Sequence, residues 1–343
     1  MDTNSTYIKR CFELAINGVG YVAPNPLVGC VIVCDGNIIG EGYHQQYGGP
    51  HAEVNAINSV KDKSLLSRAT LYVNLEPCSH FGKTPPCANL IIESKIPKVV
   101  ICNTDPFELV SGKGIQLLRK HNIEVITGVL EKEGRVLNKR FFTWVEKKRP
   151  YVILKWAQSA DGYIWSEKQS KISNDYFNML NHFWRTHEPA ILIGKNTALI
   201  DNPLLTSRLV YGPNPKRIVV DFNLELPGTL NLFNSDAETI VLNNKKEELQ
   251  NNITFKKISD KNTSTILDAL FELKIQSVII EGGRQLLTSF INDGLWDEIR
   301  KLESNVMLNS GVAAPNFSGT PLEEINLDNN KLLIFFNDDK HTS

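Results

Sequence analysis

Three residues able to bind zinc and one carboxylate occur close together in the first part of the chain: His51, Cys78, Cys87 and Glu53. A catalytic zinc takes three nitrogen or sulfur ligands from the protein and keeps an open position for water, which one histidine and two cysteines can provide. Water on such a metal has its pKa lowered to about 7, so hydroxide is available at neutral pH. Glu53, two residues after the histidine, is placed to carry a proton to a departing amine. The spacing therefore predicts a hydrolytic zinc centre.

The order of these residues matches the pattern of zinc deaminases that act on nucleobases, His-x-Glu followed by Pro-Cys-x-x-Cys. Here Pro77 precedes Cys78, and eight residues separate the two cysteines, so the last spacing is wider than in that pattern. The alternative is that His51 caps a helix and both cysteines are core thiols. We favour a zinc site because the histidine, the glutamate and both cysteines occur in the order of the deaminase pattern, before expected helices.

His80 is a rival metal ligand because it lies two residues after Cys78. A fourth protein ligand would close the site and make the zinc structural, which would leave Glu53 without a task. We therefore expect His80 to contact substrate. His80 shares the segment 77–87 with Gly82 and Lys83. A cationic side chain beside a flexible glycine suits an anionic substrate group such as phosphate. That the segment is simply a solvated loop is an equally good interpretation.

Strand-like and helix-like segments alternate through the first part of the chain, which predicts an α/β sandwich around a sheet. We expect helices over 5–18, 51–60 and 87–94 and after Gly114, and strands over 28–34, 37–43, 70–75, 98–102 and 123–127. Four other cysteines have surroundings typical of core thiols: Cys11, Cys30, Cys34 and Cys102.

A charged stretch over 143–149, ending at Pro150, separates this alternation from a second one. We therefore place a domain boundary near 146, which gives domains 1–146 and 147–343. In the second domain we expect strands over 151–157, 190–194, 217–221, 238–242, 277–281 and 297–306, with helices over 173–187, 264–273 and 284–293. The second domain is thus also predicted to be α/β.

The second domain has no G-x-G-x-x-G after its first strand, so the usual dinucleotide fingerprint is absent. An apolar strand does run into Gly282 and Gly283 and then into a helix. Such a turn lets backbone N–H groups approach a phosphate at a helix N-terminus, although it is also common for purely geometric reasons.

Length and composition indicate a soluble protein of about two domains. The chain has 343 residues, of which 42% are hydrophobic and 22% are charged, so it can bury ordinary cores. Its 37 Lys and Arg nearly balance its 38 Asp and Glu, which gives no electrostatic argument for a nucleic-acid or membrane partner. No apolar run approaches the ~20 residues of a spanning helix, and the N-terminus lacks the apolar region of a signal peptide. We expect a cytoplasmic protein.

Three segments together resemble the bifunctional deaminase/reductase family of riboflavin biosynthesis. They are residues 24–29 (Pro-Asn-Pro-Leu-Val-Gly), 48–56 (Gly-Gly-Pro-His-Ala-Glu-Val-Asn-Ala) and 76–87 (Glu-Pro-Cys-Ser-His through Thr-Pro-Pro-Cys). Cytidine and tRNA-adenosine deaminases share His-x-Glu and Pro-Cys but usually have a short gap between the cysteines, so the long loop with His80 and Lys83 discriminates. The resemblance implies an N-terminal cytidine-deaminase-like α/β/α sandwich.

By this resemblance, the zinc ligands are His51, Cys78 and Cys87, and Glu53 is the catalytic acid and base. The implied reaction is hydrolytic removal of the 2-amino group from 2,5-diamino-6-(5-phosphoribosylamino)pyrimidin-4-one, with release of ammonia. One residue is expected to hydrogen-bond the pyrimidine ring, and three to contact the ribose phosphate: Asn25 for the ring, and His44, His80 and Lys83 for the phosphate.

Residues 155–162 and 194–208 are similar to the reductase domain of the same family, which has a dihydrofolate-reductase-like α/β fold. That domain uses NADPH to reduce the ribosyl side chain of 5-amino-6-(5-phosphoribosylamino)uracil to ribityl. Matching positions imply cofactor contacts from Ala157, Thr197, Asp201, Gly283, Arg284, Gln285, Leu286, Leu287, Thr288 and Ser289. They imply sugar-phosphate contacts from Arg185, Leu205, Arg208 and Glu281. Lys155 is our candidate for polarising the sugar carbonyl or imine during hydride transfer.

Simpler roles remain open for some of these residues. Arg185 could be a surface helix residue, and 201–203 could be a plain turn. Where the family often has Trp-Ile-Thr or Trp-Ile-Ser, this chain has Lys171, Ile172 and Ser173, so the usual aromatic wall beside the cofactor is missing. We assign no cofactor contacts in this segment.

Two other functions stay open on the sequence. A deaminase acting on another nucleobase or on tRNA would need a basic face on its second domain, which the balanced charge does not support. A protein with a purely structural zinc would be expected to lack Glu53 or one ligand, and all four residues are present. The expected partners are phosphorylated pyrimidines, with no nucleic acid and no membrane, and the family resemblance implies a homo-oligomer formed through the reductase domain.

Overall fold

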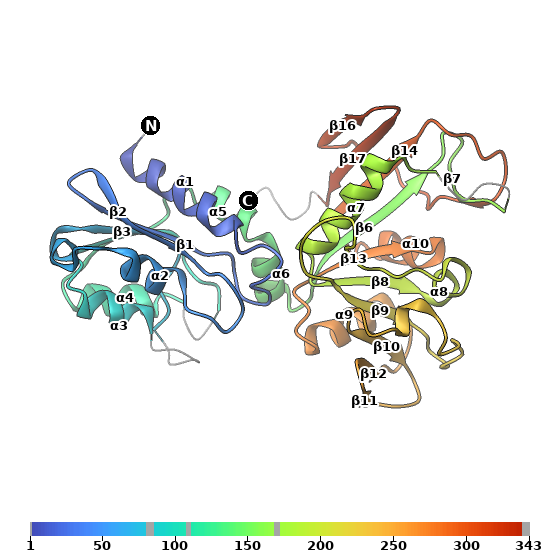
Figure 1. Ribbon diagram of the computed structural model, residues 1–343, viewed down its shortest axis with the longest axis horizontal. Helices are drawn as coiled ribbons and strands as arrows, with labels where there is room; N and C mark the ends of the chain where they lie inside the picture. Colours follow the sequence, from blue (N-terminus) through green and yellow to red (C-terminus); the bar gives the residue numbers. More distant parts are fainter. Residues whose placement is uncertain (1, 80–85, 108–110, 168–171, 338–343) are drawn as a thin grey trace. The chain divides into compact units, whose positions relative to one another are not determined.

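The computed structural model describes residues 2–79, 86–107, 111–167 and 172–337, and its chain divides into two compact units, Met1–Lys148 and Arg149–Ser343 (Figure 1). The boundary expected near 146 falls in the last turn of α6 (Lys139–Lys147). This helix buries Phe142 and Val145 in the first unit, against Leu75 of the sheet. Because its apolar residues are flanked by charged ones, the segment looks like a linker in sequence but forms a helix.

The first unit is built on a five-stranded sheet in the order β2-β1-β3-β4-β5. β1 pairs antiparallel with β2 and β3, whereas β3, β4 and β5 are parallel. The strands are β1 (Gly29–Cys34), β2 (Asn37–Tyr43), β3 (Thr70–Leu75), β4 (Lys98–Asn103) and β5 (Glu124–Ile126). The helices are α1 (Thr3–Ile16), α2 (Ala52–Ser59), η1 (Lys63–Arg68), α3 (Cys87–Glu93), α4 (Lys113–Lys120), α5 (Glu131–Leu137) and α6.

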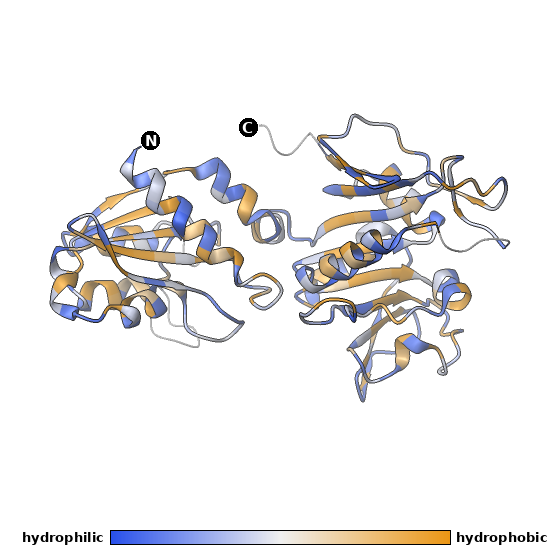
Figure 2. Cartoon of the chain, turned by 45° about the horizontal axis from the view of Figure 1, so that its top comes forward, coloured by the Kyte–Doolittle hydropathy of each residue, from blue (hydrophilic) through white to orange (hydrophobic). Residues whose placement is uncertain are grey.

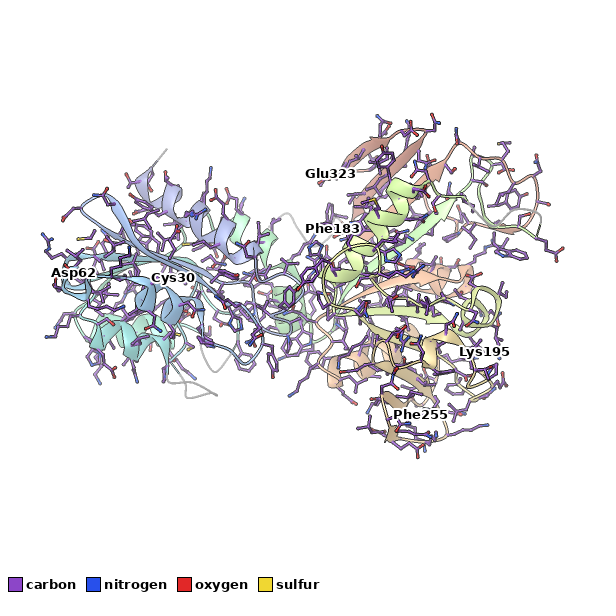
Figure 3. All side chains as sticks on the ribbon, viewed as in Figure 1. Cys30, Asp62, Phe183, Lys195, Phe255 and Glu323 are labelled. Carbon is purple, nitrogen blue, oxygen red and sulfur yellow. The ribbon has the colours of Figure 1, made fainter. Side chains whose placement is uncertain are left out.

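Helices cover both faces of this sheet. Apolar residues of α2, α3 and α4 pack on one face, and Ile8 of α1 packs on the other. Alternate residues of β1 supply the two cores, since Ile32 faces the first and Val31 faces the second. The predicted α/β/α sandwich is therefore confirmed. The four cysteines expected in the core are all buried, including Cys30, which is labelled in Figure 3.

The second unit contains a ten-stranded sheet in the order β11-β12-β10-β9-β8-β13-β6-β14-β17-β16, and a separate pair of β7 and β15. The seven strands from β12 to β14 are parallel, and each remaining strand pairs antiparallel with its neighbour. The strands are β6 (Tyr151–Gln158), β7 (Tyr163–Trp165), β8 (Ala190–Gly194), β9 (Lys216–Val220), β10 (Thr239–Asn243), β11 (Glu248–Gln250), β12 (Ile253–Lys257), β13 (Ser277–Gly282), β14 (Glu298–Ser304), β15 (Val312–Ala313), β16 (Glu323–Leu327) and β17 (Asn330–Phe336). The helices are α7 (Asp175–His187), α8 (Lys195–Asp201), η2 (Asn231–Phe233), α9 (Thr263–Glu272) and α10 (Arg284–Asn292).

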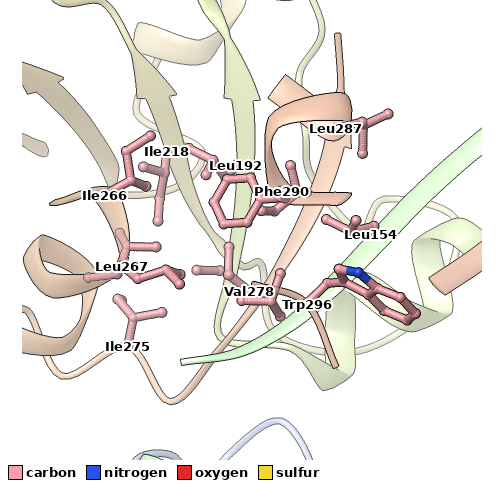
Figure 4. Close-up of a cluster of buried hydrophobic side chains, with 14 of the residues drawn as sticks. Leu154, Leu192, Ile218, Ile266, Leu267, Ile275, Val278, Leu287, Phe290 and Trp296 are labelled. Atoms are coloured by element: carbon pink, nitrogen blue, oxygen red, sulfur yellow. The ribbon is translucent and has the colours of Figure 1, made fainter. Parts of the chain in front are cut away.

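The main core of the second unit lies between the sheet and helices α9 and α10. Figure 4 shows Leu192 and Val278 from the strands among Leu267 of α9 and Phe290 of α10. On the opposite face, Phe177 of α7 packs with Leu302 of β14, and α8 covers another apolar cluster. The central parallel strands are thus covered on both sides, as their continuous apolar sequences predict.

Hydropathy follows these layers in both units. Figure 2 shows the strands coloured mostly hydrophobic and the helices in mixed colours, because a helix on a sheet buries one side only. In the described part of the chain, no helix combines the length and the apolar character that a membrane crossing requires.

The expected strands and helices are found within a few residues of their predicted limits, but several elements were not predicted. Helices α5, α6 and α8 lie in segments rich in charged residues or read as turns. Strand β16 is exposed along nearly its whole length, so no alternating pattern marks it, and only its pairing with β17 makes it a strand.

Candidate functional site

The first unit brings His51, Cys78 and Cys87 together, with one ligand atom of each within 4.8 Å of the others. His51 is the N-cap of α2, Cys87 is the first residue of α3, and Cys78 follows the end of β3. The Nδ1 atom of His51 lies 3.6 Å from Cys78 Sγ and 3.3 Å from Cys87 Sγ. One imidazole nitrogen and two sulfurs form the donor set of a catalytic zinc site, so these residues fit that metal.

The surroundings of Cys78 favour its thiolate. Hydrogen bonds from Cys87 and His51 lower the pKa of Cys78, although burial opposes them. Its sulfur also accepts from the backbone N–H of Cys87 at the start of α3, at 3.3 Å. The hydrogen bond between His51 and Cys78 raises the pKa of His51 to about 9, although burial opposes it. Because a cysteine binds metal as the thiolate, Cys78 is prepared for that role by its neighbours.

Glu53 lies in the first turn of α2 and is buried beside the three ligands. Burial raises the pKa of its carboxyl to about 7, although the charge of His51 lowers it. A carboxyl group that exchanges its proton near neutral pH is suited to general acid and base catalysis. The site therefore combines a metal-binding donor set with a proton-transfer group.

Asn25 and His44 form a chain of contacts that leads to the ligand His51. The side-chain Nδ2 of Asn25 lies 3.0 Å from Nε2 of His44, and Nδ1 of His44 lies 2.9 Å from the carbonyl oxygen of Pro50. A carbonyl only accepts, so Nδ1 carries the proton and Nε2 accepts from Asn25. Burial lowers the pKa of His44, which agrees with a neutral ring. The ring of His44 also meets that of His51 edge to face, with centroids 5.5 Å apart.

Glu76 holds the segment that leads into Cys78. Its buried carboxylate accepts from four backbone N–H groups, at 2.9 to 3.3 Å, those of Asp105, Gly112, Gly114 and Ile115. At Gly114 a Cβ atom would lie 2.0 Å from the carbonyl oxygen of Pro77, so only glycine lets α4 approach this closely. The start of α4 is thus fastened to the residues just before Cys78. The role of Glu76 cannot be predicted from the sequence, because nothing local identifies its partners.

The second unit brings together two charged residues on adjacent strands and a third on α7. Arg185 of α7 donates from Nη2 to Glu281 of β13 at 2.9 Å and from Nη1 to the carbonyl of Thr206 at 3.1 Å. Lys155 is buried on β6, the neighbour of β13. Burial alone would raise the pKa of Glu281, but the charges of Arg185 and Lys155 lower it to about 2. Burial lowers the pKa of Lys155, against the opposing charge of Glu281.

A pocket of about 290 Å³ adjoins this charged group. Arg185, Leu205 and Arg208, three of the residues expected to face a sugar phosphate, line it. Its remaining lining residues include His182, Asn178 and Asn181 of α7, which were not predicted to belong to a site. His182 is one helical turn before Arg185, and this i, i+3 spacing was the signal that could have found it.

The residues expected to contact a dinucleotide gather where β8 and β13 end. These strands are neighbours, and α8 and α10 begin directly after them. A Cβ atom on Gly283 would lie 3.1 Å from Oγ1 of Thr197, and Gly282 has a φ of +131°. Glycines thus leave room between two helix N-termini, which is the kind of cradle that accepts a phosphate. Ala157 lies on β6, and Asp201 ends α8 with its side chain exposed.

Comparisons with known proteins cover both units. A model of the cytidine and deoxycytidylate deaminase zinc-binding region matches residues 1–103, and a model of the RibD C-terminal domain matches residues 150–336. The riboflavin biosynthesis protein RibD of Aquifex aeolicus (strain VF5) is 40% identical over 332 residues, covering 94% of this chain and 93% of that protein. The chain belongs to the RibD family.

Solved structures of RibD proteins agree in fold along nearly the whole chain. A deaminase/reductase from Thermotoga maritima superposes with a TM-score of 0.87 at 40% identity, covering 96% of this chain and 97% of that one. RibD of Acinetobacter baumannii (form 2) gives a TM-score of 0.88 at 31% identity, covering 97% and 98%. The first unit is thus the cytidine-deaminase-like domain, and the second is the dihydrofolate-reductase-like domain of RibD.

Membership of the RibD family makes this protein a bifunctional enzyme of riboflavin biosynthesis, with a deaminase (hydrolase) and a reductase (oxidoreductase) activity. Its deaminase domain is zinc-binding, and the reductase domain of the family depends on NADPH. This confirms the zinc and NADPH expected from the sequence.

Some of the residues expected to belong to the RibD sites lie outside the described part of the chain or are buried. His80, Lys83 and Lys171 lie outside the described residues. Leu287 is fully buried in the core of the reductase domain, as Figure 4 shows, so its side chain is not available to a cofactor. A contact between Leu287 and the cofactor, expected as part of the run Gly283 to Ser289, is therefore restricted to the backbone of Leu287.

His182 gives the RibD reductase domain a testable dependence on pH. Burial and the charges of Arg185 and Arg208 lower its pKa to about 4, from an ordinary 6.5. Between these values the unfolded chain binds a proton at this position that the folded domain does not bind, so stability rises with pH across this window. We expect His182→Gln to remove this contribution and to flatten the fall in stability from about pH 6.5 to about pH 4.

Urea unfolding followed by tryptophan fluorescence across that pH range measures the effect, because Trp156, Trp165, Trp184 and Trp296 all lie in the second unit. His121→Gln, which alters an exposed histidine of the first unit, is the matched control and should keep the wild-type slope. Equal slopes for His182→Gln and wild type would contradict the prediction.

Proposed function

We propose that the first unit removes the 2-amino group from 2,5-diamino-6-(5-phosphoribosylamino)pyrimidin-4-one and that the second unit reduces the ribosyl chain of the product with NADPH. The observation that carries the proposal is the convergence of His51, Cys78 and Cys87 beside buried Glu53. The Thermotoga maritima relative is described as a diaminohydroxyphosphoribosylaminopyrimidine deaminase and a 5-amino-6-(5-phosphoribosylamino)uracil reductase, which supports these two substrates.

In the deaminase site, His51, Cys78 and Cys87 would hold zinc, which would supply activated water for the hydrolysis. Glu53 takes a proton from the attacking water and delivers it to the departing amino group, because its pKa of about 7 lets it exist in both forms. Asn25 hydrogen-bonds the pyrimidine ring through the amide that His44 orients. His80 and Lys83 contact the ribose phosphate; the contact also expected from His44 does not fit its ring, whose Nδ1 donates to Pro50 O and whose Nε2 accepts from Asn25.

In the reductase site, the pocket beside α7 takes the sugar phosphate. Arg208 contributes a guanidinium to its wall, while Arg185 is held in place by Glu281 and Thr206. Leu205 supplies an apolar contact in the same wall. Lys155 donates a proton to the carbonyl oxygen or imine nitrogen as the adjacent carbon is reduced, and its lowered pKa makes it a better donor.

Residues at the ends of β8 and β13 would hold NADPH, which would supply the hydride. Its contacts come from Ala157, Thr197, Asp201 and the segment Gly283, Arg284, Gln285, Leu286, Thr288 and Ser289, with the backbone of Leu287. The glycine-lined space between the starts of α8 and α10 supports a phosphate there.

We further propose that the enzyme acts on small phosphorylated pyrimidines in the cytoplasm, without nucleic acid or membrane partners. The balanced charge of the chain supports this, because nucleic-acid binding needs a basic surface. Assembly into a homo-oligomer through the reductase domain is part of the same proposal, and light scattering of the full chain and of variants on that domain tests it. The domain limits 1–146 and 147–343 are proposed as the working division between the two activities.

The decisive experiment measures zinc content, ammonia release from the diaminopyrimidine substrate, and NADPH oxidation in one sample of the full chain. We expect stoichiometric zinc and ammonia release, followed by NADPH consumption. Ammonia without NADPH oxidation would reject the reductase proposal. Bound zinc without ammonia would reject the substrate and favour a deaminase that acts on another base.

Cys78→Ser is expected to release the metal while the reductase domain stays active. Serine is a much weaker zinc ligand than a thiolate, and His51 loses the partner that raises its pKa. Metal analysis after dialysis should find substoichiometric zinc, and NADPH oxidation with the deaminated substrate should be unchanged. Cys34→Ser, a buried cysteine that does not belong to the ligand group, should keep its zinc. Full zinc occupancy in Cys78→Ser would refute the ligand assignment.

A further inference from the structure

The backbone of Leu27 is clamped by two buried asparagine side chains from other parts of the first unit. Asn138 accepts from Leu27 N at 2.8 Å and donates to Leu27 O at 2.9 Å. Asn74 of β3 donates to the same oxygen at 2.8 Å and accepts from Gly29 N at 2.7 Å. Both polar groups of the Leu27 peptide backbone are thus satisfied by side chains rather than by a neighbouring strand.

Asn138 makes this contact at the junction of two helices. It is at once the C-cap of α5 and the N-cap of α6. Asparagine is among the preferred N-cap residues because its side chain can accept from the first turn of a helix. Here the side chain makes no such bond and reaches Leu27, which is 111 residues away in the sequence. The Asn138 side chain therefore does not cap α6 and makes a long-range contact with Leu27 instead.

The clamped segment leads directly to the deaminase site. Leu27 is two residues from Asn25, whose amide contacts His44, and the backbone N–H of His44 donates to Val28 O at 2.9 Å. His44 in turn contacts the carbonyl of Pro50, the residue before His51. Movement of Leu27 would therefore shift Asn25 and His44 together, while the three zinc ligands are carried by α2, α3 and the end of β3.

We propose that Asn138 is a positioning residue of the deaminase, which holds Leu27 so that the Asn25 amide meets the pyrimidine ring. This inference rests on the substrate role proposed for Asn25. It makes the deaminase site dependent on the α5–α6 junction, which lies beyond residues 1–103 matched by the zinc-binding deaminase model. Specificity for the ring is thus supported by a part of the chain that carries no zinc ligand.

The first test is Asn138→Ala in the full chain, assayed for ammonia release. Since a contact that binds substrate and transition state equally affects KM and not kcat, KM should rise roughly tenfold with kcat nearly unchanged. Zinc should remain stoichiometric, and the reductase activity of the second unit should be unchanged, so it reports on the integrity of the sample. Val136→Ala, on the same helix but 66% exposed, is the matched control and should behave as wild type.

A second variant separates positioning from simple loss of stability. Asn138→Asp keeps the size and the acceptor for Leu27 N, but it replaces the donor to Leu27 O with a carboxylate oxygen that the carbonyl repels, so the clamp is broken without leaving a cavity. It should raise KM as well, with zinc retained. An unchanged KM in both variants, or a loss of zinc that accompanies every loss of activity, overturns the proposal.

A double-mutant cycle with Asn25→Ala tests whether Asn138 acts through Asn25. If it does, the effects of Asn25→Ala and Asn138→Ala on KM will not multiply, because the first change removes the group that the second misplaces. Multiplying effects overturn the inference and leave the role of Asn25 intact. A wild-type KM in Asn25→Ala instead shows that the proposed substrate contact of Asn25 is wrong.

Discussion

Glu53→Gln will abolish ammonia release while the protein keeps its zinc. Glutamine has the same shape as glutamate, so the first turn of α2 and the ligand His51 should stay in place. It cannot take up a proton and pass it on, and removal of a general acid and base usually costs about 10²–10⁴-fold in rate. The side chain is not a member of the His51, Cys78 and Cys87 group, so metal content should be unaffected.

Three measurements on Glu53→Gln make the outcome unambiguous. Metal analysis should show stoichiometric zinc, the ammonia assay should show the loss, and the reductase should still oxidise NADPH when given the deaminated substrate. Glu93→Gln, an exposed glutamate of α3, is the control and should release ammonia normally. Ammonia release at a near wild-type rate by Glu53→Gln would mean that another group transfers the proton.

Lys155→Met is expected to give the complementary result: ammonia release continues and NADPH oxidation falls by roughly 10²-fold or more. Lys155 is buried on β6 next to the Arg185–Glu281 pair, and it is the proton donor that we propose for the reduced carbonyl or imine. Methionine fills a similar space without a charge, and Glu281 keeps Arg185 as its partner. The second unit should therefore stay folded, since the variant leaves no buried charge alone.

The control for this change is Lys331→Met, which alters an exposed lysine of β17 in the same unit. It should oxidise NADPH as wild type does. Unfolding in urea followed by tryptophan fluorescence should show similar midpoints for both variants. Wild-type NADPH oxidation by Lys155→Met, under conditions that detect a tenfold loss, would remove Lys155 from the mechanism.

In both variants, Glu53→Gln and Lys155→Met, the unaltered unit provides an internal control. Each variant alters one unit, and the other unit reports whether the sample is folded and active. If a change in one unit abolished both reactions with their separate substrates supplied, the defect would lie in folding or assembly and not in the site that was altered.

The groups that perform the chemistry, and most of the elements that carry them, can be predicted from the amino-acid sequence alone. His51, Glu53, Cys78 and Cys87 could be identified because metal ligation and proton transfer require particular residue types in a particular order. The buried strands were predictable because their apolar runs are local; the strand expected over 28–34 is β1, Gly29–Cys34.

How those groups are held, and which residues complete the sites, becomes visible in the folded chain. Nothing near Glu76 in sequence identifies the backbone N–H groups of α4 that it accepts from, and Asn138 cannot be told from an ordinary helix cap until Leu27 is placed beside it. The spacing of His182 and Arg185 places them on one side of a helix, but only the fold placed α7 and the segment 203–209 around one pocket. The physical reason is that these hydrogen bonds and pocket walls join residues far apart in the chain, whereas periodicity and motif spacing report only on neighbours.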